Sequence, residues 1–225
     1  MDGIFVPDIQ QVSNLLRELF PICRSITGNG VRKTLAILRE ITNFEILEIP
    51  TGTICYDWSI PKEWNVNDAY VKDQSGNKVI DFQKNNLHLK NYSIPIQKII
   101  SFEELESHLD TLPDMPDAIP YRTSYYKEDW GFCISHNQYV NLDKYATYEV
   151  VIDTSLKNGS LTYGQKIVKG ESKFEFLIST YCCHPSLAND NLSGMVLWIL
   201  LLHWIKQKKE NIVIDLLLYL KQLEQ

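Results

Sequence analysis

The stretch "STYCCHPSLANDNLSG" (Ser179 to Gly194) joins two apolar segments through one short polar loop. The residues before the loop, "KFEFLISTYCC" (Lys173 to Cys183), predict a strand that becomes nearly all apolar, as is typical of a central strand covered on both faces. The residues after it, to about Lys208, predict a buried helix. A strand, loop and helix in this order favour an α/β fold. Ligands in open α/β sheets bind beyond the carboxyl ends of strands, which is where this loop lies.

Both ends of the chain contribute to this α/β domain. The spacing of apolar residues predicts helices over 8–20 and 31–41 and strands over 44–50 and 211–220. The elements before and after the middle of the chain are therefore expected to form one discontinuous α/β domain, residues 1–57 and 166–225.

The middle of the chain, residues 58–165, has a different pattern. It is rich in aromatic residues, short strand-like segments and turn signals. The expected elements are a hairpin over 69–82 around Ser75-Gly76-Asn77, a helix over 101–109, and a hairpin over 147–170 around Asn158-Gly159. We interpret this region as a small inserted β-rich domain, to which the sequence assigns no role.

Composition excludes several classes of function. The chain has 225 residues and a net charge of −6, and its basic residues are scattered, so nucleic acid is not an expected partner. The most apolar run, Met195 to Ile205, is shorter than the roughly 20 residues needed to span a membrane, and the N-terminus has no signal-peptide pattern. An odd number of cysteines without framework spacing indicates a reducing cytoplasm. They are Cys23, Cys55, Cys133, Cys182 and Cys183.

The loop itself contains two candidate metal ligands, His184 and Asp190. Imidazole nitrogen and carboxylate oxygen are both natural ligands for zinc, and the turn-forming residues between them could bring the two side chains together. Two residues cannot complete a zinc site, however. Asp190 could instead cap the helix that begins near Asn191, and His184 could be an ordinary hydrogen-bonded loop histidine. Residue type and spacing leave both interpretations open.

Three segments resemble one known family. They are "CHPSLANDNLSG" (183–194), "LFPICRSITGNGVRKTL" (19–35) and "WSIPKEWNVNDAYVKD" (58–73). Together they are similar to the aminopeptidase-like branch of the zinc exopeptidases that use two co-catalytic zinc ions, many of which are associated with polysaccharide biosynthesis. The resemblance implies an aminopeptidase fold, a three-layer sheet with a small domain of unknown role inserted before the site loop.

The resemblance also implies a function. His184 matches the first metal-ligand histidine of the family, and Asp190 matches the aspartate that binds or bridges the metals. The implied reaction is metal-assisted hydrolysis of a peptide or amide bond, with zinc polarising the carbonyl and a glutamate as general base that we cannot assign in this chain. Better-known zinc aminopeptidases have an aspartate two residues after the histidine, where this chain has Ser186.

The C-terminal segment departs from the family. The family continues with a Pro-Glu-Thr-Ile-Gly stretch whose glutamate belongs to the active centre, whereas this chain reads "LYLKQLEQ" (218–225). A reading frame shifted by one base could encode Ile-Pro-Glu-Thr-Ile-Gly-Ala there, which suggests a frameshift and a truncated copy. With so few ligands, we expect weak or absent zinc binding and an inactive chain.

Two other functions compete with the truncated hydrolase. One is a non-catalytic protein that binds a peptide or glycan and has a vestigial metal site. Its binding surface would include aromatic residues of the insertion such as Trp58, Trp64 and Trp130, although a core role for them is the favoured interpretation. The other is a hydrolase acting on amide bonds of sugar or cell-wall intermediates. The sequence gives no indication of the oligomeric state.

Overall fold

The computed structural model describes residues 8–125, 127–169, 175–207 and 213–219. The chain divides into two compact units, which are described separately. Unit 1 is formed by Met1–Glu63 and Asn158–Gln225, and unit 2 by Trp64–Lys157. In the described part of the chain, no helix combines the length and the apolar character needed to cross a bilayer.

Unit 1 has a four-stranded sheet in the order β1-β10-β12-β11. The strands are β1 (Glu45–Pro50), β10 (Ser160–Val168), β12 (Val213–Tyr219) and β11 (Glu175–Tyr181). β10 runs antiparallel to both β1 and β12, whereas β11 and β12 are parallel. A short hairpin of β2 (Ile54–Cys55) and β3 (Trp58–Ser59) belongs to the same unit. The sheet is therefore mixed, and β11, one strand of its parallel pair, leads into the loop that contains His184 and Asp190.

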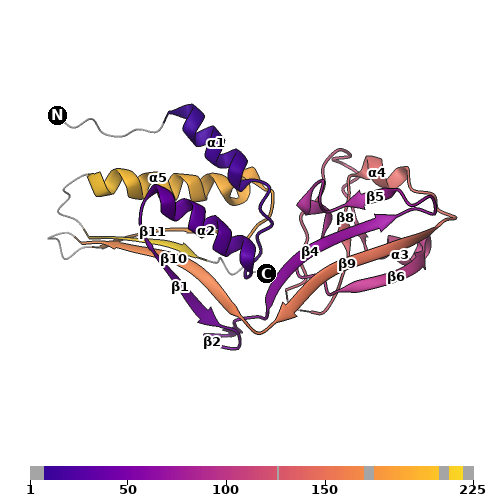
Figure 1. The fold of residues 1–225 in the computed structure, drawn as a ribbon, viewed down its shortest axis with the longest axis horizontal. Helices are drawn as coiled ribbons and strands as arrows, with labels where there is room; N and C mark the ends of the chain where they lie inside the picture. The colour runs from indigo at the N-terminus through magenta and orange to yellow at the C-terminus, as the bar shows by residue number, and fades with distance from the viewer. Residues whose placement is uncertain (1–7, 126, 170–174, 208–212, 220–225) are drawn as a thin grey trace. The chain divides into compact units, whose positions relative to one another are not determined.

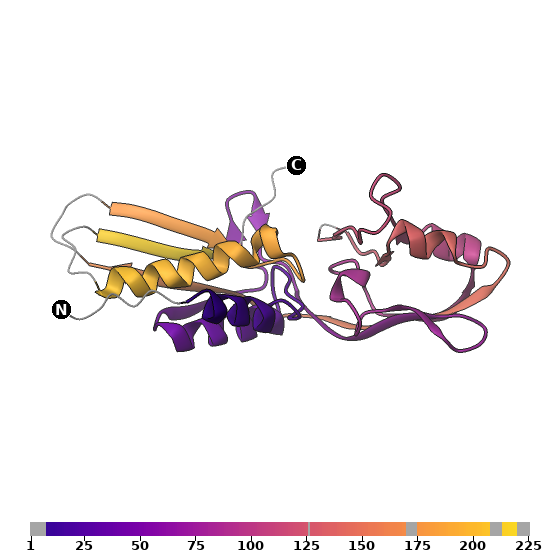
Figure 2. The same ribbon diagram turned by 90° about the horizontal axis from the view of Figure 1, so that it is seen from above.

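Three helices cover one face of this sheet (Figures 1 and 2). They are α1 (Ile9–Leu19), α2 (Asn29–Ile41) and α5 (Ser193–Gln207). Asp8 and Gln11 form a capping box that begins α1. α2 and α5 pack on the sheet, α1 packs on α5, and Phe44 packs edge-on against Trp198 with ring centroids 5.3 Å apart. α1, α2, α5 and β1 confirm the three helices and the strand over 44–50 that the sequence predicts.

β11 differs from the expected central strand. In the described sheet it lies at the edge and pairs with β12. Phe176 is 57% exposed and Leu177 is 63% exposed, so neither face of β11 is covered at these residues. The expectation of a doubly covered strand is wrong for the described residues, because an apolar sequence does not specify which neighbours a strand will have.

Unit 2 is built on a second four-stranded sheet, in the order β5-β4-β9-β6. Its strands are β4 (Glu63–Lys72), β5 (Lys78–Asp81), β6 (Ile96–Ser101) and β9 (Thr147–Lys157). The smaller elements are η1 (Asn86–His88), α3 (Phe102–Glu106), β7 (Leu109–Asp110), β8 (Phe132–Cys133) and α4 (His136–Val140). β4 and β5 form the expected hairpin, closed by the Asp73 carboxylate accepting from the backbone N–H groups of Ser75 and Asn77.

The second expected hairpin, around Asn158-Gly159, does not form. β9 pairs within the sheet of unit 2, whereas β10 pairs with β1 and β12 in unit 1. The Asn-Gly pair therefore marks a turn between two sheets, since a turn sequence specifies a change of direction and not the pairing of the strands beside it. Unit 2 spans Trp64–Lys157, whereas the expected insertion is 58–165; β3 and β10 lie in unit 1.

Two tryptophans of unit 2, Trp64 and Trp130, belong to its core. Trp64 is 2% exposed and Trp130 is 6% exposed. Trp64 stacks on Tyr92 with centroids 5.6 Å apart, and its Nε1 donates to the Ser93 carbonyl at 3.0 Å. Burial with a satisfied indole N–H is the usual arrangement of a structural tryptophan. These two residues therefore do not provide the surface that a binding protein would need.

Candidate metal site

The structure brings His184 and Asp190 together. His184 follows the carboxyl end of β11, and Asp190 lies in η2 (Ala188–Leu192), an irregular segment that leads into α5. Nδ1 of His184 is 3.9 Å from Oδ1 of Asp190. A loop of seven residues therefore places an imidazole and a carboxylate side by side, and we refer to His184–Asp190 as the metal-ligand loop.

Asp190 does not act as a helix cap. In the described part of the chain, its carboxylate accepts from the Tyr181 hydroxyl and faces His184, and no backbone N–H of α5 donates to it. The hydrogen bond to Asp190 stabilises the protonated phenol, and burial and the carboxylate charge add to this effect, so the pKa of Tyr181 is raised to about 12. Tyr181 is therefore a permanent donor to Asp190 at neutral pH.

The two candidate ligands differ in exposure. The His184 side chain is 5% exposed, whereas that of Asp190 is 57% exposed. Burial lowers the pKa of His184, the Asp190 carboxylate opposes this shift, and the Arg24 charge adds to it. The imidazole is neutral at pH 7, which is the form that binds a metal. The Tyr181 ring packs edge-on against it, with centroids 5.5 Å apart, and Cys183 Sγ lies 3.7 Å from Nδ1.

Asn191 folds the loop back onto β11. Its side-chain amide donates to the Thr180 hydroxyl and, at 3.2 Å, to the Tyr181 carbonyl. The peptide bond between Asp190 and Asn191 is cis. Gly194 leaves room for this arrangement, because a Cβ there would lie 2.1 Å from Oδ1 of Asn191. The Asn-Asp-Asn triplet and the following glycine therefore serve loop geometry as well as the candidate ligands.

These two residues fit a zinc ion as part of its ligand set. Zinc binds imidazole nitrogen and carboxylate oxygen at roughly 2.0–2.2 Å, so two ligands of one ion can be no more than about 4.4 Å apart. The observed 3.9 Å satisfies this limit. In the residues that the structure describes, no group of three or more His, Cys, Asp or Glu side chains could hold a metal. The metal role of His184 and Asp190 stays a prediction.

Sequence reasoning missed the residues that hold the loop. Arg24 is fully buried, and its Nε and Nη2 donate to the carbonyls of His184 at 2.9 Å and Pro185 at 3.2 Å. The Ser186 hydroxyl donates to the Phe20 carbonyl at 2.7 Å. The only available signal was an arginine beside an apolar run, in the segment "RSITGNG" that the sequence identifies merely as a loop.

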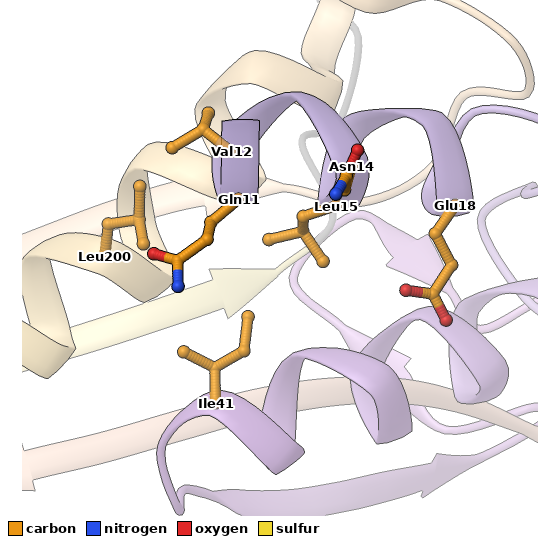
Figure 3. A pocket seen from close by; sticks show the side chains of 7 residues that line it. All are labelled: Gln11, Val12, Asn14, Leu15, Glu18, Ile41 and Leu200. Atoms are coloured by element: carbon orange, nitrogen blue, oxygen red, sulfur yellow. The ribbon is translucent and has the colours of Figure 1, made fainter. Parts of the chain in front are cut away.

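Two hollows lie on the helical side of unit 1. One, of about 390 Å³, opens between α1, α2 and α5 (Figure 3). Its apolar residues are Val12, Leu15, Ile41 and Leu200, and its polar residues are Gln11, Asn14 and Glu18. The other, of about 270 Å³, is lined by Ser13, Leu16, Arg17, Phe20, Ala188 and Leu192. Neither His184 nor Asp190 lines them, so neither hollow belongs to the candidate metal site.

A mixed sheet covered by helices, with a second unit inserted between two of its strands, defines an α/β protein with an insertion. The chain belongs to the DUF4910 family, described as a domain of unknown function, which it matches over residues 13–220. The aminopeptidase-like character expected from the resemblance is confirmed by the relatives below.

The chain is 54% identical over 187 residues to a Clostridium acetobutylicum protein named for polysaccharide biosynthesis and an aminopeptidase-like domain. That match covers 83% of this chain and 43% of the relative. A crystal structure of a candidate peptidase from the same organism superimposes with a TM-score of 0.91 at 50% identity, covering 93% of this chain and 50% of that one. The chain therefore spans about half the length of these relatives.

More distant structures share the fold. A zinc aminopeptidase from Bacillus subtilis has a TM-score of 0.56 at 10% identity, covering 92% of this chain and 59% of that chain. A peptidase M28 precursor from Shewanella amazonensis has a TM-score of 0.54 at 12% identity, covering 93% and 63%. At these identities the similarity establishes the α/β architecture alone. Residues 220–225, where a frameshift was expected to replace a family motif, lie outside the described residues.

Proposed function

We propose that this chain carries two ligands of a zinc-dependent, aminopeptidase-like hydrolase, His184 and Asp190. The observation that supports this most directly is the 3.9 Å separation of Nδ1 and Oδ1 beyond the carboxyl end of a parallel strand. The neutral imidazole and the carboxylate are chemically suited to zinc. The substrate class is a peptide or a small amide, and the site of action is the cytoplasm, consistent with five free cysteines.

The chain's own residues would hold and orient the metal. Tyr181 fixes one oxygen of Asp190 by hydrogen bonding, and the Tyr181 ring supports the face of His184. Such outer contacts typically orient ligands and adjust their affinity. When bound, zinc would supply Lewis-acid polarisation of the scissile carbonyl and activation of water. We assign no general base among the described residues.

We further propose that this chain alone binds zinc weakly and does not hydrolyse peptides. Catalytic zinc sites use at least three protein ligands, and the chain supplies two candidates among its described residues. The remaining ligands would come from parts of the fold that the relatives have and this chain does not span. This explains how a site with suitable local geometry can be incomplete.

Zinc titration followed through the five histidine rings by NMR tests this proposal. We expect the His184 signals to move at millimolar zinc, while His88 stays unchanged, and Asp190→Asn to weaken the response. Hydrolysis of an amino-acid p-nitroanilide should be undetectable with this chain and measurable with the C. acetobutylicum relative. Tight stoichiometric zinc binding by the monomeric chain would contradict the incomplete site, and an unresponsive His184 would contradict the metal site.

A second substrate class has one supporting observation. The C. acetobutylicum relative is named for polysaccharide biosynthesis. An amide bond in a sugar or cell-wall intermediate has the same carbonyl chemistry as a peptide bond, so the same ligands would serve. Assaying the relative with N-acyl amino sugars beside the p-nitroanilides separates the two classes, because the preferred one should have the higher kcat/KM.

A further inference from the structure

Arg24 connects two segments of unit 1 that are far apart in the sequence. Its Nε donates to the carbonyl of His184, 160 residues away, and its Nη2 donates to the carbonyl of Pro185. Its Nη1 donates to the Leu19 carbonyl at 2.7 Å. A guanidinium presents these donors in a rigid planar fork, so it fixes the acceptors relative to one another.

We propose that Arg24 is the positioning residue of the candidate metal site. It acts on the backbone of the metal-ligand loop and thereby sets the direction of the His184 imidazole. The inference rests on the proposed function, since it assigns to Arg24 the orientation of a proposed zinc ligand. It goes beyond that function by naming a residue outside the loop on which the ligand geometry depends.

Ser186 explains why the loop needs a backbone clamp, by which we mean the hydrogen bonds from Arg24 to the carbonyls of His184 and Pro185. In better-known zinc aminopeptidases, outside the branch that this chain resembles, an aspartate at this position orients the metal-ligand histidine. Here the Ser186 hydroxyl donates its one hydrogen to the Phe20 carbonyl, so it cannot also donate to the imidazole. Both Ser186 and Arg24 thus hold the backbone of the loop against the segment Leu19–Arg24, and neither carries the negative charge of the aspartate.

The N-terminal part of α2 holds Arg24 in place. The Thr34 hydroxyl lies 3.4 Å from Nη1 of Arg24 and itself donates to the Gly30 carbonyl at 2.9 Å. A Cβ on Gly30 would lie 1.8 Å from the carbonyl oxygen of Cys23, so only glycine allows the first turn of α2 to approach the backbone beside Arg24. The "RSITGNG" segment therefore has a structural reason for its arginine and for this glycine.

The orientation of His184 is sensitive to this clamp. The ring sits between the Tyr181 ring, at 5.5 Å and an interplanar angle of 77°, and the Asp190 carboxylate. A rotation of the His184 backbone would move Nδ1 away from Asp190 and the ring away from Tyr181. Residues that orient a metal ligand typically change metal affinity 10- to 100-fold when they are replaced.

The test uses Arg24→Lys in the whole chain, because lysine keeps the charge and loses the planar fork. At a temperature where both proteins are fully folded by circular dichroism, we expect zinc affinity measured at His184 to fall at least about tenfold. In the metal-free protein, we expect the NOE between the rings of His184 and Tyr181 to weaken or disappear. Arg32→Lys is the matched control, since Arg32 of the same unit binds Glu48 and Glu63, and it should leave both measurements unchanged.

Unchanged affinity and an unchanged NOE in folded Arg24→Lys would overturn the inference. If that variant does not fold, the wild-type chain still tests the inference. A coupling across the hydrogen bond from Arg24 Nε to the His184 carbonyl carbon must then be measurable. Its absence would refute the proposed hold of Arg24 on the loop backbone. If zinc fails to move the wild-type His184 signals, the proposed function is wrong, while the NOE in Arg24→Lys still determines whether Arg24 positions the ring.

Discussion

His88 in unit 2 and His184 in unit 1 are buried to the same degree but have different surroundings. His88 is 5% exposed and His184 is 6% exposed, and burial lowers the pKa of both. Nδ1 of His88 donates to the Cys133 carbonyl at 2.8 Å, because a carbonyl oxygen can only accept. Nδ1 of His184 faces a carboxylate that is 57% exposed.

The groups around the two rings distinguish a structural histidine, His88, from a candidate metal ligand, His184. The His88 ring is anchored by a backbone carbonyl inside a core, which satisfies its N–H and leaves that nitrogen no lone pair for a metal. The backbone of His184 is held by Arg24, while its ring is directed at a second potential ligand that reaches solvent. Both histidines are buried and have a lowered pKa. These two properties therefore do not identify a metal site unless a second potential ligand lies beside the ring.

The largest expected effect comes from breaking the surroundings of His88. Phe132 is fully buried and precedes Cys133, whose carbonyl accepts from His88. Phe132→Ala should destabilise unit 2 by about 3–5 kcal/mol, because a large cavity forms in its core. Urea unfolding followed by NMR should show early loss of the His88 signals. Phe132→Leu, which keeps most of the volume, should have a smaller effect, and a shift of the His184 signals in either folded variant would contradict the comparison.

Gly30→Ala should have the next largest effect and act on the other histidine. The added methyl would lie 1.8 Å from the Cys23 carbonyl oxygen, so the start of α2 must shift, which we expect to cost about 1–3 kcal/mol even though alanine favours helices. The His184 signals should move and those of His88 should not. Gly76→Ala is the control: Gly76 has φ +83° with open space around it, so the cost should be about 1–2 kcal/mol from backbone strain alone. A stabilised Gly30→Ala protein would contradict this account.

Much of the fold follows from local patterns. The periodicity of apolar residues predicted α1 and α2, a continuous apolar run predicted α5, and alternation predicted β1, since these signals are encoded within one element. Strand partners were not predictable in the same way. β11 was expected at the centre of a sheet and β9 was expected to pair with β10, and both expectations were wrong because pairing depends on segments far away in the sequence.

The candidate site likewise contains some residues that local sequence patterns predict and others that depend on distant segments. His184 and Asp190 could be selected from residue type, spacing and resemblance, because both lie in one short loop. Arg24 could not, because it acts through backbone carbonyls 160 and 161 residues away, and a carbonyl leaves no trace in the sequence. The hydrogen bond from Tyr181 to Asp190 gives no signal in the sequence either, because an aromatic residue at a strand end is equally typical of a core.

A pH titration tests whether the protonation of His88 affects the stability of unit 2. Its pKa is lowered from 6.5 chiefly by burial, with a smaller lowering from Lys84 and opposing contributions from the Cys133 hydrogen bond and Asp81. The unfolded chain therefore binds more protons below pH 6.5, so the stability of unit 2 is complete above that pH and falls as the pH drops toward the folded pKa. His88→Gln can still donate to the carbonyl and does not titrate. In urea titrations between pH 7 and 5, this variant should reduce the pH dependence of the free energy of unfolding. An unaltered pH dependence would exclude His88 as its origin.

The smallest expected effect tests the edge position of β11, the strand that leads to His184. Phe176 is 57% exposed, whereas Ile178, two residues further along, packs against the core of unit 1. Phe176→Ser should therefore change the free energy of unfolding by less than about 0.5 kcal/mol and leave the His184 signals in place. Ile178→Ser should cost more, about 1–3 kcal/mol, because it removes a half-buried side chain from that core. If Phe176→Ser proves as destabilising as Ile178→Ser, then Phe176 is covered in solution and the first interpretation of β11, as a strand covered on both faces, is restored.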